Sequence, residues 1–171
     1  KIVWYESVVT MSITATNGSS EVSDGEITND STLTLTFTTS EATTNFIESD
    51  VAVTNGNLSS FDATSSTVYT AILTPSADGQ VIIDVPEGSF TNALGDGNLA
   101  AQFNWTCDIA GPTMTITATS SSGAIGDDGS CNNCDEVILT FTSSEATTNF
   151  AAGDISVTDG WLNSFSSTSS T

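Results

Sequence analysis

The sequence predicts an all-β protein in which antiparallel β-sandwiches of seven strands each follow one another in tandem. Short segments alternate apolar and polar residues with a period of two, which is the pattern of a half-buried strand. Turn-forming residues separate these segments, and no segment shows a sustained helical period. In addition, one stretch recurs about a hundred residues further along the chain, which is the length of a domain and not of a solenoid turn.

Seven predicted strands make up one complete repeat. In order, they are 11–16, 32–38, 51–53, 58–61, 69–73, 81–85 and 103–105. In the second strand, Leu33, Leu35 and Phe37 are expected to face a core. Threonines alternate with them, and β-branched residues suit the outer face of a pleated sheet. The Asn55-Gly56 pair after the third strand predicts a tight turn.

The internal repeat is the most informative feature of the chain. The segment TFTTSEATTNF at 36–46 recurs as TFTSSEATTNF at 140–150. Upstream, MSITAT at 11–16 recurs as MTITAT at 114–119, at a spacing shorter by one residue. A duplication with small insertions between the matched strands explains why the spacing differs between the two matches.

The repeat divides the chain into three predicted parts. Residues 1–8 hold the last strand of a preceding repeat and a linker, residues 9–108 form one complete repeat, and residues 109–171 form the N-terminal part of a following repeat. We interpret the chain as a window from a longer array. In an alternative interpretation, Ile2–Glu6 completes a neighbouring molecule by strand exchange.

The charge balance excludes several function classes. Twenty-one acidic residues face a single basic residue, Lys1, and the chain has no histidine. Nothing can neutralise phosphates, so nucleic acid and anionic membrane surfaces are not expected as partners. No apolar run approaches the roughly 18 residues of a membrane-spanning helix.

The same composition predicts that the protein is not an enzyme. Activation of a nucleophile and stabilisation of an oxyanion lose their usual side chains when histidine, arginine and internal lysine are absent. A pair of carboxylates can hydrolyse glycosides. The acidic residues here, however, fall in predicted turns or beside outward strand positions, away from any apolar cluster that would raise a pKa.

A family resemblance covers nearly the whole chain. The most specific stretch is 69–105, which contains PSADG at 75–79, GDGN at 95–98 and FNW at 103–105. With SEATTNF, this order resembles the bacterial immunoglobulin-like repeat domains of large surface proteins. The resemblance implies an immunoglobulin-like sandwich that serves as a spacer or an adhesive module in a long extracellular protein. The scarcity of lysine and the cysteine-bearing insertion at 123–135 depart from many family members.

Calcium at the junctions between modules is the main chemical hypothesis. If the seven strands run up and down, two acidic loops and the entering linker gather at one pole, where oxygen ligands suit a hard cation. The second repeat presents the same arrangement. The candidate ligands are Glu6, Glu41, Asp50, Asp96, Asn98, Asp108, Glu145 and Asp154. The alternative is that these are solvated turn residues, since Asp and Asn favour turns.

Three cysteines are too few for a disulfide framework. Cys131 and Cys134 are expected to form a small loop disulfide in an oxidising compartment, because zinc needs a second pair of ligands. Cys107, in the predicted linker, should lie far from them and is either free or bridged to another chain.

Four N-x-S/T sequons, together with the acidity, favour an extracellular or cell-surface location with glycans possible. The acceptors are Asn17, Asn29, Asn57 and Asn104. Trp161 replaces Asn57 in the second repeat and lies next to an inward-facing leucine, so it should face outward. It is a candidate contact to a neighbouring module or to a carbohydrate.

Two functions follow from the sequence. In the first, the chain is a structural repeat of an extracellular stalk or filament, and its partners are other repeats of the same protein and neighbouring copies. In the second, the repeats are adhesin modules that bind surface glycans or another ligand. Because the SEATTNF loop is nearly identical in both repeats, a repeated junction fits better than a single specific site.

Overall fold

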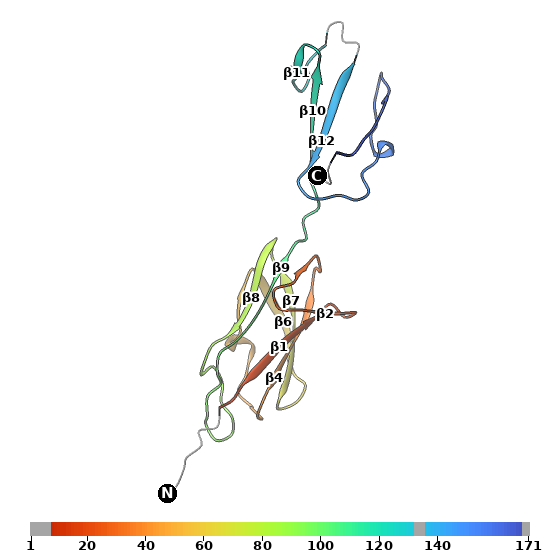
Figure 1. The fold of residues 1–171 in the computed structure, drawn as a ribbon. Coiled ribbons are helices and arrows are strands. Elements are labelled where there is room, and N and C mark those ends of the chain that lie inside the picture. Colours follow the sequence, from red (N-terminus) through yellow and green to blue (C-terminus); the bar gives the residue numbers. More distant parts are fainter. Residues whose placement is uncertain (1–7, 132–135, 169–171) are drawn as a thin grey trace. The chain divides into compact units, whose positions relative to one another are not determined.

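The computed structural model describes residues 8–131 and 136–168, and within these residues the regular elements are β-strands and two single turns of 3₁₀-helix. The chain divides into unit 1, Lys1–Ala110, and unit 2, Gly111–Thr171 (Figure 1). The all-β class predicted from the alternating pattern is confirmed.

The first sheet of unit 1 has five strands, and all neighbouring strands in it are antiparallel. Their spatial order is β2 (Glu21–Val22), β1 (Met11–Thr16), β4 (Leu33–Thr39), β7 (Val68–Pro75) and β6 (Gly56–Ala63). The β6–β7 pairing shifts register between Ser59 and Asp62, where Ser60 has a φ of 53°. This bulge bends β6 at the edge of the sheet.

The second sheet of unit 1 has four strands. Their order is β3 (Ile27–Thr28), β9 (Ala101–Cys107), β8 (Gly79–Val85) and β5 (Ala52–Thr54). β8 pairs antiparallel with both β9 and β5, whereas β3 pairs parallel with β9. The 3₁₀-helix η1 (Glu48–Asp50) lies in the connection between β4 and β5.

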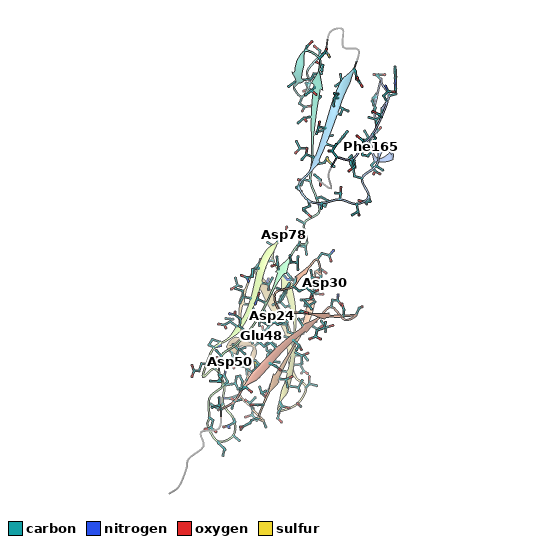
Figure 2. All side chains as sticks on the ribbon, in the orientation of Figure 1. Asp24, Asp30, Glu48, Asp50, Asp78 and Phe165 are labelled. Carbon is teal, nitrogen blue, oxygen red and sulfur yellow. The ribbon has the colours of Figure 1, made fainter. Side chains whose placement is uncertain are left out.

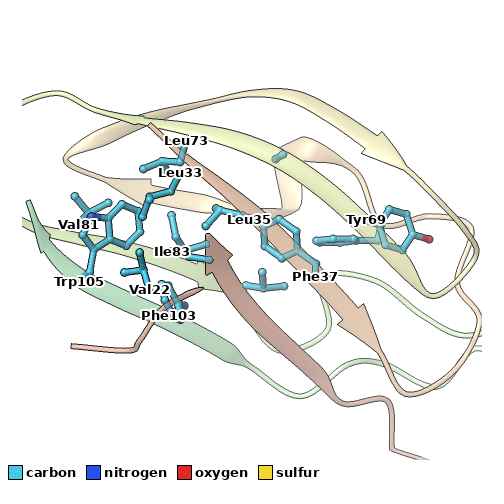
Figure 3. Packing of buried hydrophobic residues seen from close by; sticks show 14 of the residues in the cluster. Val22, Leu33, Leu35, Phe37, Tyr69, Leu73, Val81, Ile83, Phe103 and Trp105 are labelled. Atoms are coloured by element: carbon cyan, nitrogen blue, oxygen red, sulfur yellow. The ribbon is translucent and has the colours of Figure 1, made fainter. Parts of the chain in front are cut away.

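The core lies between these two sheets (Figure 3). The inward positions of β4 are buried while the alternate threonines are exposed or half-buried, as the period-two pattern predicts. From the facing sheet, Val81, Ile83 and Trp105 are fully buried. Trp105 Nε1 has no hydrogen-bond partner among the described residues, so apolar packing alone holds this ring. The sandwich architecture predicted from the sequence is therefore present in unit 1.

The number of strands differs from the seven expected. Unit 1 has nine strands in its described residues, because the two-residue strands β2 and β3 are too short to show an alternating pattern. The chain changes sheets between β2 and β3, between β3 and β4, between β4 and β5, between β5 and β6, and between β7 and β8.

The predicted tight turn forms between β5 and β6. Asn55 has a φ of 57°, a left-handed conformation that asparagine tolerates better than most residues. A side chain at Gly56 would place its Cβ 3.1 Å from the carbonyl oxygen of Thr74. Glycine therefore allows β6 to approach β7 closely at this end of the sheet.

The strands at the two ends of unit 1 are internal strands. β1 lies between β2 and β4 in one sheet, and β9 lies between β3 and β8 in the other. The chain enters at the pole where Val9 bridges Asn98, and it leaves β9 at the opposite pole, where Cys107 lies opposite Gly79 (Figure 1). Each of the two terminal strands is thus hydrogen-bonded to a neighbouring strand on both sides.

Unit 2 contains a three-stranded antiparallel sheet and one turn of 3₁₀-helix. The strand order is β11 (Gly123–Ile125), β10 (Met114–Ser120) and β12 (Val137–Ser143), and η2 (Ala152–Asp154) follows. Leu139 of β12 is 37% exposed, whereas Leu35 of β4 is fully buried. Within the described residues of unit 2, no second sheet covers this face.

Candidate functional site

Two loops meet at the entering pole of unit 1, as expected from the predicted calcium site. The first joins β4 to β5, and the second joins β8 to β9. Thr43 and Asn92 form an antiparallel bridge between the loops. Asn45 uses both ends of its amide on Thr91: its Oδ1 accepts the backbone N–H at 3.1 Å, and its Nδ2 donates to Oγ1 at 3.3 Å.

On the side that faces the core, aromatic rings also pack the β4–β5 loop against the β8–β9 loop. The ring centroids of Phe46 and Phe90, one from each loop, lie 4.9 Å apart, and Phe90 is buried. Tyr69 packs edge-to-face on Phe46, and its hydroxyl donates to the backbone oxygen of Thr43 at 2.8 Å. Burial raises the pKa of Tyr69. The alternating pattern of residues 69–73 includes Tyr69 but does not show the partner that the hydroxyl of an inward tyrosine needs.

The two loops bring Glu41 and Asp96 to one amide group. Nδ2 of Asn92 donates to Glu41 Oε2 at 2.7 Å and to Asp96 Oδ2 at 3.0 Å. Oδ1 of Asn92 in turn accepts the backbone N–H groups of Leu94 and Asp96, both at 2.9 Å. Asn92, which the sequence analysis did not single out, therefore bridges two carboxylates and shapes the loop that carries one of them.

Asn98, one of the predicted calcium ligands, makes its side-chain hydrogen bonds within its own loop. Its side chain is buried, and its Oδ1 accepts the N–H of Phe90 at 2.9 Å. Its Nδ2 donates to the backbone oxygens of Pro86 and Leu99. Every polar group of this amide is engaged by backbone, so Asn98 holds the loop together.

Two other predicted ligands make local hydrogen bonds. Asp50 Oδ2 accepts the N–H of Ile47 at 2.9 Å and thereby closes η1. The backbone N–H of Asp108 donates to Thr28, beyond the end of β9. Glu6 lies outside the described residues. Among the residues that the structure describes, no group of three or more His, Cys, Asp or Glu side chains is gathered as a metal site.

The same contacts recur in unit 2 at matching sequence positions. Ala118 lies opposite Leu139 in the β10–β12 pair, as Ala15 lies opposite Leu35 in the β1–β4 pair. The aromatic pair Phe141–Phe150, with centroids 5.4 Å apart, repeats the pair Phe37–Phe46 at 5.5 Å.

Hydrogen bonds outside the strands repeat as well. Asp154 closes η2 by accepting the N–H of Ala151 at 2.9 Å, as Asp50 does in η1. Thr113 donates its N–H to Ser144 Oγ at 2.9 Å, the distance of the corresponding bond in unit 1. Glu145, the counterpart of Glu41, is half-buried. The two units therefore share one local geometry.

Carboxylates at the leaving pole of unit 1 bind backbone. Asp78 Oδ1, in the turn between β7 and β8, accepts the N–H groups of Ile109 at 2.7 Å and Ala110 at 3.0 Å (Figure 2). Asp24 Oδ1 accepts both the backbone N–H and the side-chain amide of Asn104. Asp78 thus fastens the segment that leaves β9.

Cys107 is not in a linker. It is the last residue of β9, it is buried, and it is a free cysteine. Burial raises the pKa of the Cys107 thiol, and the charges of Asp78 and Asp108 raise it further. A thiol in this position is closed to a bridge with another chain while the unit stays folded.

Cys131 is disulfide-bonded, whereas Cys134 lies outside the described residues. The pairing of these two cysteines therefore stays a prediction. In the sequons, Asn17, Asn29 and Asn57 are exposed, whereas Asn104 lies within β9 with its amide nitrogen bonded to Asp24 at 2.9 Å. The Asn17 amide nitrogen is bonded to Asp30 in the same way, and glycosylation of the four sequons stays a prediction.

Trp161 faces outward, as predicted: it is 85% exposed, whereas the neighbouring Leu162 is half-buried. What Trp161 contacts stays a prediction. In the described part of the chain, no helix has the length and hydropathy to cross a membrane.

Two packed sheets, entered at one pole and left at the other, define an immunoglobulin-like β-sandwich module. The family model described as Bacterial Ig-like domain matches residues 10–107, and the chain belongs to this family. Domains of this family commonly occur in surface proteins and are typically non-catalytic. Neither a curated protein nor a solved structure matches the chain.

Proposed function

We propose that this chain is a structural repeat of an extracellular stalk or filament, in which stacked modules provide reach and resist tension. The observation that carries the proposal is the placement of the two terminal strands of unit 1. Both β1 and β9 are internal strands, and the chain enters and leaves at opposite poles. Tension along the chain therefore acts on strands that are held on both sides.

The direction of the load matters as much as the number of bonds. Hydrogen bonds in an antiparallel pair run perpendicular to the strands, so a pull along a strand loads a whole row at once. β9 faces β8 over seven residue pairs, and β1 faces β4 over six. A pull across a hairpin instead breaks the bonds one after another, which needs less force.

The repetition of local geometry supports a tandem arrangement. Strand register, aromatic pairs and 3₁₀ caps of unit 1 recur in unit 2 at a spacing of about a hundred residues. A spacer gains length by repeating one module, and the same loops then lie at each connection between consecutive modules. The near absence of basic residues suits this role, since equal charges along the array keep the modules apart.

Single-molecule force spectroscopy tests the proposal. The chain is held at its two ends, and unit 1 is expected to unfold in one step that adds roughly 30 nm of contour for a module of about 98 residues. As a control, the same chain is pulled through attachment sites at Asn57 and Thr74, which are paired at the open end of the β6–β7 hairpin. The end-to-end pull should need the higher force, and an equal or lower force would contradict the proposal.

Calcium and glycan binding stay predictions beside this role. For calcium, Glu41 and Asp96 are the two predicted ligands that the folded loops bring together. Thermal unfolding in excess calcium is compared with unfolding in EGTA; equal melting temperatures would retire the calcium hypothesis. Reproducible binding of the chain to a glycan array would favour the adhesin alternative.

A further inference from the structure

Of the large hydrophobic side chains that the structure describes, that of Trp161 is the most exposed, at 85%. The other described tryptophan, Trp105, is fully buried in the core of unit 1. A single exposed apolar side chain is common on protein surfaces and marks no site by itself. What matters is therefore how the chain places this ring and which groups surround it.

The turn before Trp161 repeats a turn of unit 1. Asp159 has a φ of 59°, and its counterpart Asn55 has a φ of 57°. In both turns the next residue is a glycine. Trp161 therefore leaves its turn as Asn57 leaves the turn that begins β6.

Aromatic packing fixes the rest of this segment. The ring centroids of Phe150 and Phe165 lie 5.5 Å apart, with an angle of 74° between the ring planes. In unit 1, the centroids of Phe46 and Phe61 lie 5.3 Å apart, with an angle of 72°. The segment around Trp161 thus has the local geometry of the first half of β6.

Unit 1 shows that this position faces solvent in a complete sandwich. Asn57 is exposed although it pairs with Thr74 of β7 and both sheets of unit 1 are present. The next residue, Leu58, instead packs against the core. The exposure of Trp161 is therefore set by its place on the outer side of the segment and does not depend on which strands follow in the chain.

Polar groups lie beside the ring. Asn163 is two residues further along, so it faces the same side of an extended segment as Trp161. Asp159 precedes the ring in the turn. Both side chains are exposed and make no hydrogen bond among the residues that the structure describes. Along the chain, the ring is thus flanked by an amide, which donates and accepts, and by a carboxylate, which accepts.

The size of the apolar surface argues against a protein partner. A tryptophan side chain contributes about 150–250 Å². A stable protein interface instead covers about 800 Å² on each partner. Since the exposed residues on either side of the ring are polar, the apolar surface ends at the ring, and it is large enough for one small ring of a ligand.

A neutral sugar ring matches these features. A pyranose with equatorial hydroxyl groups presents C–H groups on its faces, which pack on an indole, and hydroxyl groups around its rim, which pair with amides and carboxylates. In a β-1,4-linked glucan, successive rings form a flat ribbon, so these faces stay accessible. The net charge of −20 repels an anionic sugar.

We propose that Trp161 and Asn163 form a binding site for neutral β-1,4-linked glucans. One sugar ring stacks on the indole of Trp161, and its hydroxyl groups pair with the Asn163 amide and the Asp159 carboxylate. This assigns a site and a ligand class to the adhesin alternative. It does not depend on the mechanical role of unit 1.

Titration of the chain with cellotetraose, a neutral β-1,4-linked glucan, tests the proposal. The indole Nε1–H resonance of Trp161, assigned by its loss in Trp161→Phe, should shift in a saturable way, while that of the buried Trp105 stays in place. The expected dissociation constant is on the order of 1 mM, because one stacked ring must offset the ordering of the sugar. The β-1,4-linked glucuronate tetramer, with a carboxylate on each ring, should bind at least about tenfold more weakly.

Matched variants of the chain locate the site. In Trp161→Ala, the backbone amide resonance of Asn163 should no longer respond to cellotetraose, while unchanged β10 and β12 resonances show that the fold is kept. Asn163→Ala should weaken binding several-fold. Thr115→Ala, at an exposed position of β10, should leave binding unchanged.

The equivalence of the two segments also permits a gain of function. Asn57→Trp together with Ser59→Asn places the same pair of side chains on β6 of unit 1, at two exposed positions. This variant should bind two equivalents of cellotetraose in place of one. A single equivalent would overturn the assignment of the site to this pair of side chains.

Two other results would overturn the proposal. One is the absence of saturable shifts in the unsubstituted chain, or shifts that survive Trp161→Ala. The other is self-association in sedimentation equilibrium that Trp161→Ala weakens, without a response to cellotetraose, which would make a second copy the partner of the ring. Neither result affects the force measurement on unit 1.

Discussion

At the scale of single residues, amides hold the loops of the entering pole together. Asn92 joins Glu41 to Asp96, and Asn98 binds three backbone groups. In a chain with one basic residue, a carboxylate has almost no cationic side chain to pair with. Asparagine and backbone N–H groups supply donors instead.

Substitution of Asn92 tests this dependence. Asn92→Ala removes the donor between Glu41 and Asp96 and leaves the two carboxylates facing each other, so the free energy of unfolding of unit 1 should fall by about 1–3 kcal/mol. Urea unfolding of the chain and of the variant measures this change in the free energy of unfolding. The control Asn57→Ala, at an exposed position, should change stability by less than about 0.5 kcal/mol. Equal effects of the two substitutions would contradict the role of Asn92.

The buried thiol of Cys107 should make stability depend on alkaline pH. Burial, and then the charges of Asp78 and Asp108, raise its pKa in the folded state above the unfolded value of about 8.5. Its contribution to stability is therefore fully present below the unfolded pKa and is lost as the pH rises through the folded pKa. Cys107→Val, which cannot ionise, should show a shallower loss of stability in urea unfolding between pH 8 and 10.

Tyr69 provides the internal check on that experiment. Burial raises its pKa as well, so it adds a further loss of stability at higher pH in both the unsubstituted chain and the Cys107→Val variant. The two pH profiles should therefore differ first near the unfolded pKa of the thiol. Identical profiles from pH 8 upward would contradict a raised pKa at Cys107.

At the scale of elements, the same strand pair has two environments. β1–β4 and β10–β12 share register, but β4 faces a second sheet and β12 does not within the described residues. The outgoing end of β9 is fastened separately, by the Asp78 carboxylate. Residues at matching positions of the two units therefore have different surroundings, and the same substitution should affect the two units differently.

Truncation of matched leucines should have unequal effects. Leu35→Ala removes a fully buried side chain and should destabilise unit 1 by about 2–5 kcal/mol. Leu139→Ala removes a side chain that is 37% exposed, so unit 2 should lose markedly less. Hydrogen exchange of the β4 and β12 amides measures both. Equal losses would indicate that the two leucines have the same surroundings.

The Asp78 contact should control the order of the segment after β9. Asp78→Ala frees the N–H groups of Ile109 and Ala110, whose hydrogen exchange should become at least about tenfold faster, since each loses a charge-assisted bond. Asp78→Asn keeps an acceptor oxygen and should have a smaller effect. Unchanged exchange in both variants would show that other contacts hold the segment.

At the scale of the whole molecule, the net charge of −20 is the dominant property. A net charge of this size opposes the folded state through self-repulsion. Because the chain has a single basic residue, ion pairs between side chains can offset little of that repulsion, and the packed core must overcome the rest.

Stability should therefore rise with ionic strength. From 0.01 M to 1 M NaCl, the screening length falls from about 30 Å to about 3 Å, so repulsion between carboxylates weakens and the urea midpoint should increase. NaCl and KCl should act alike if screening is the cause. A larger increase in a few millimolar CaCl₂ would indicate a specific cation site, and a midpoint that falls with salt would contradict the repulsion argument.

Much of the fold is visible in the printed sequence because burial in a sandwich follows a period of two. All seven strands predicted from alternation are present, from β1 around Ile13 to β9 around Trp105. Strands β2 and β3 were missed because two residues carry no period. The two loops predicted to meet at one pole do meet there, whereas Cys107, predicted to lie in a linker, is the last residue of β9.

The sequence by itself determined the all-β class, the repeat of the local geometry and the acidic character, because these depend on local pattern and composition. Only the tertiary structure decided what each polar side chain does. Whether Asn98 faces solvent or binds backbone depends on Phe90 and Pro86, which reach it through the folding of a long loop. Likewise, β9 lies between β3 and β8 because strands distant in the chain pack into one sheet, and the proposed mechanical role rests on that packing.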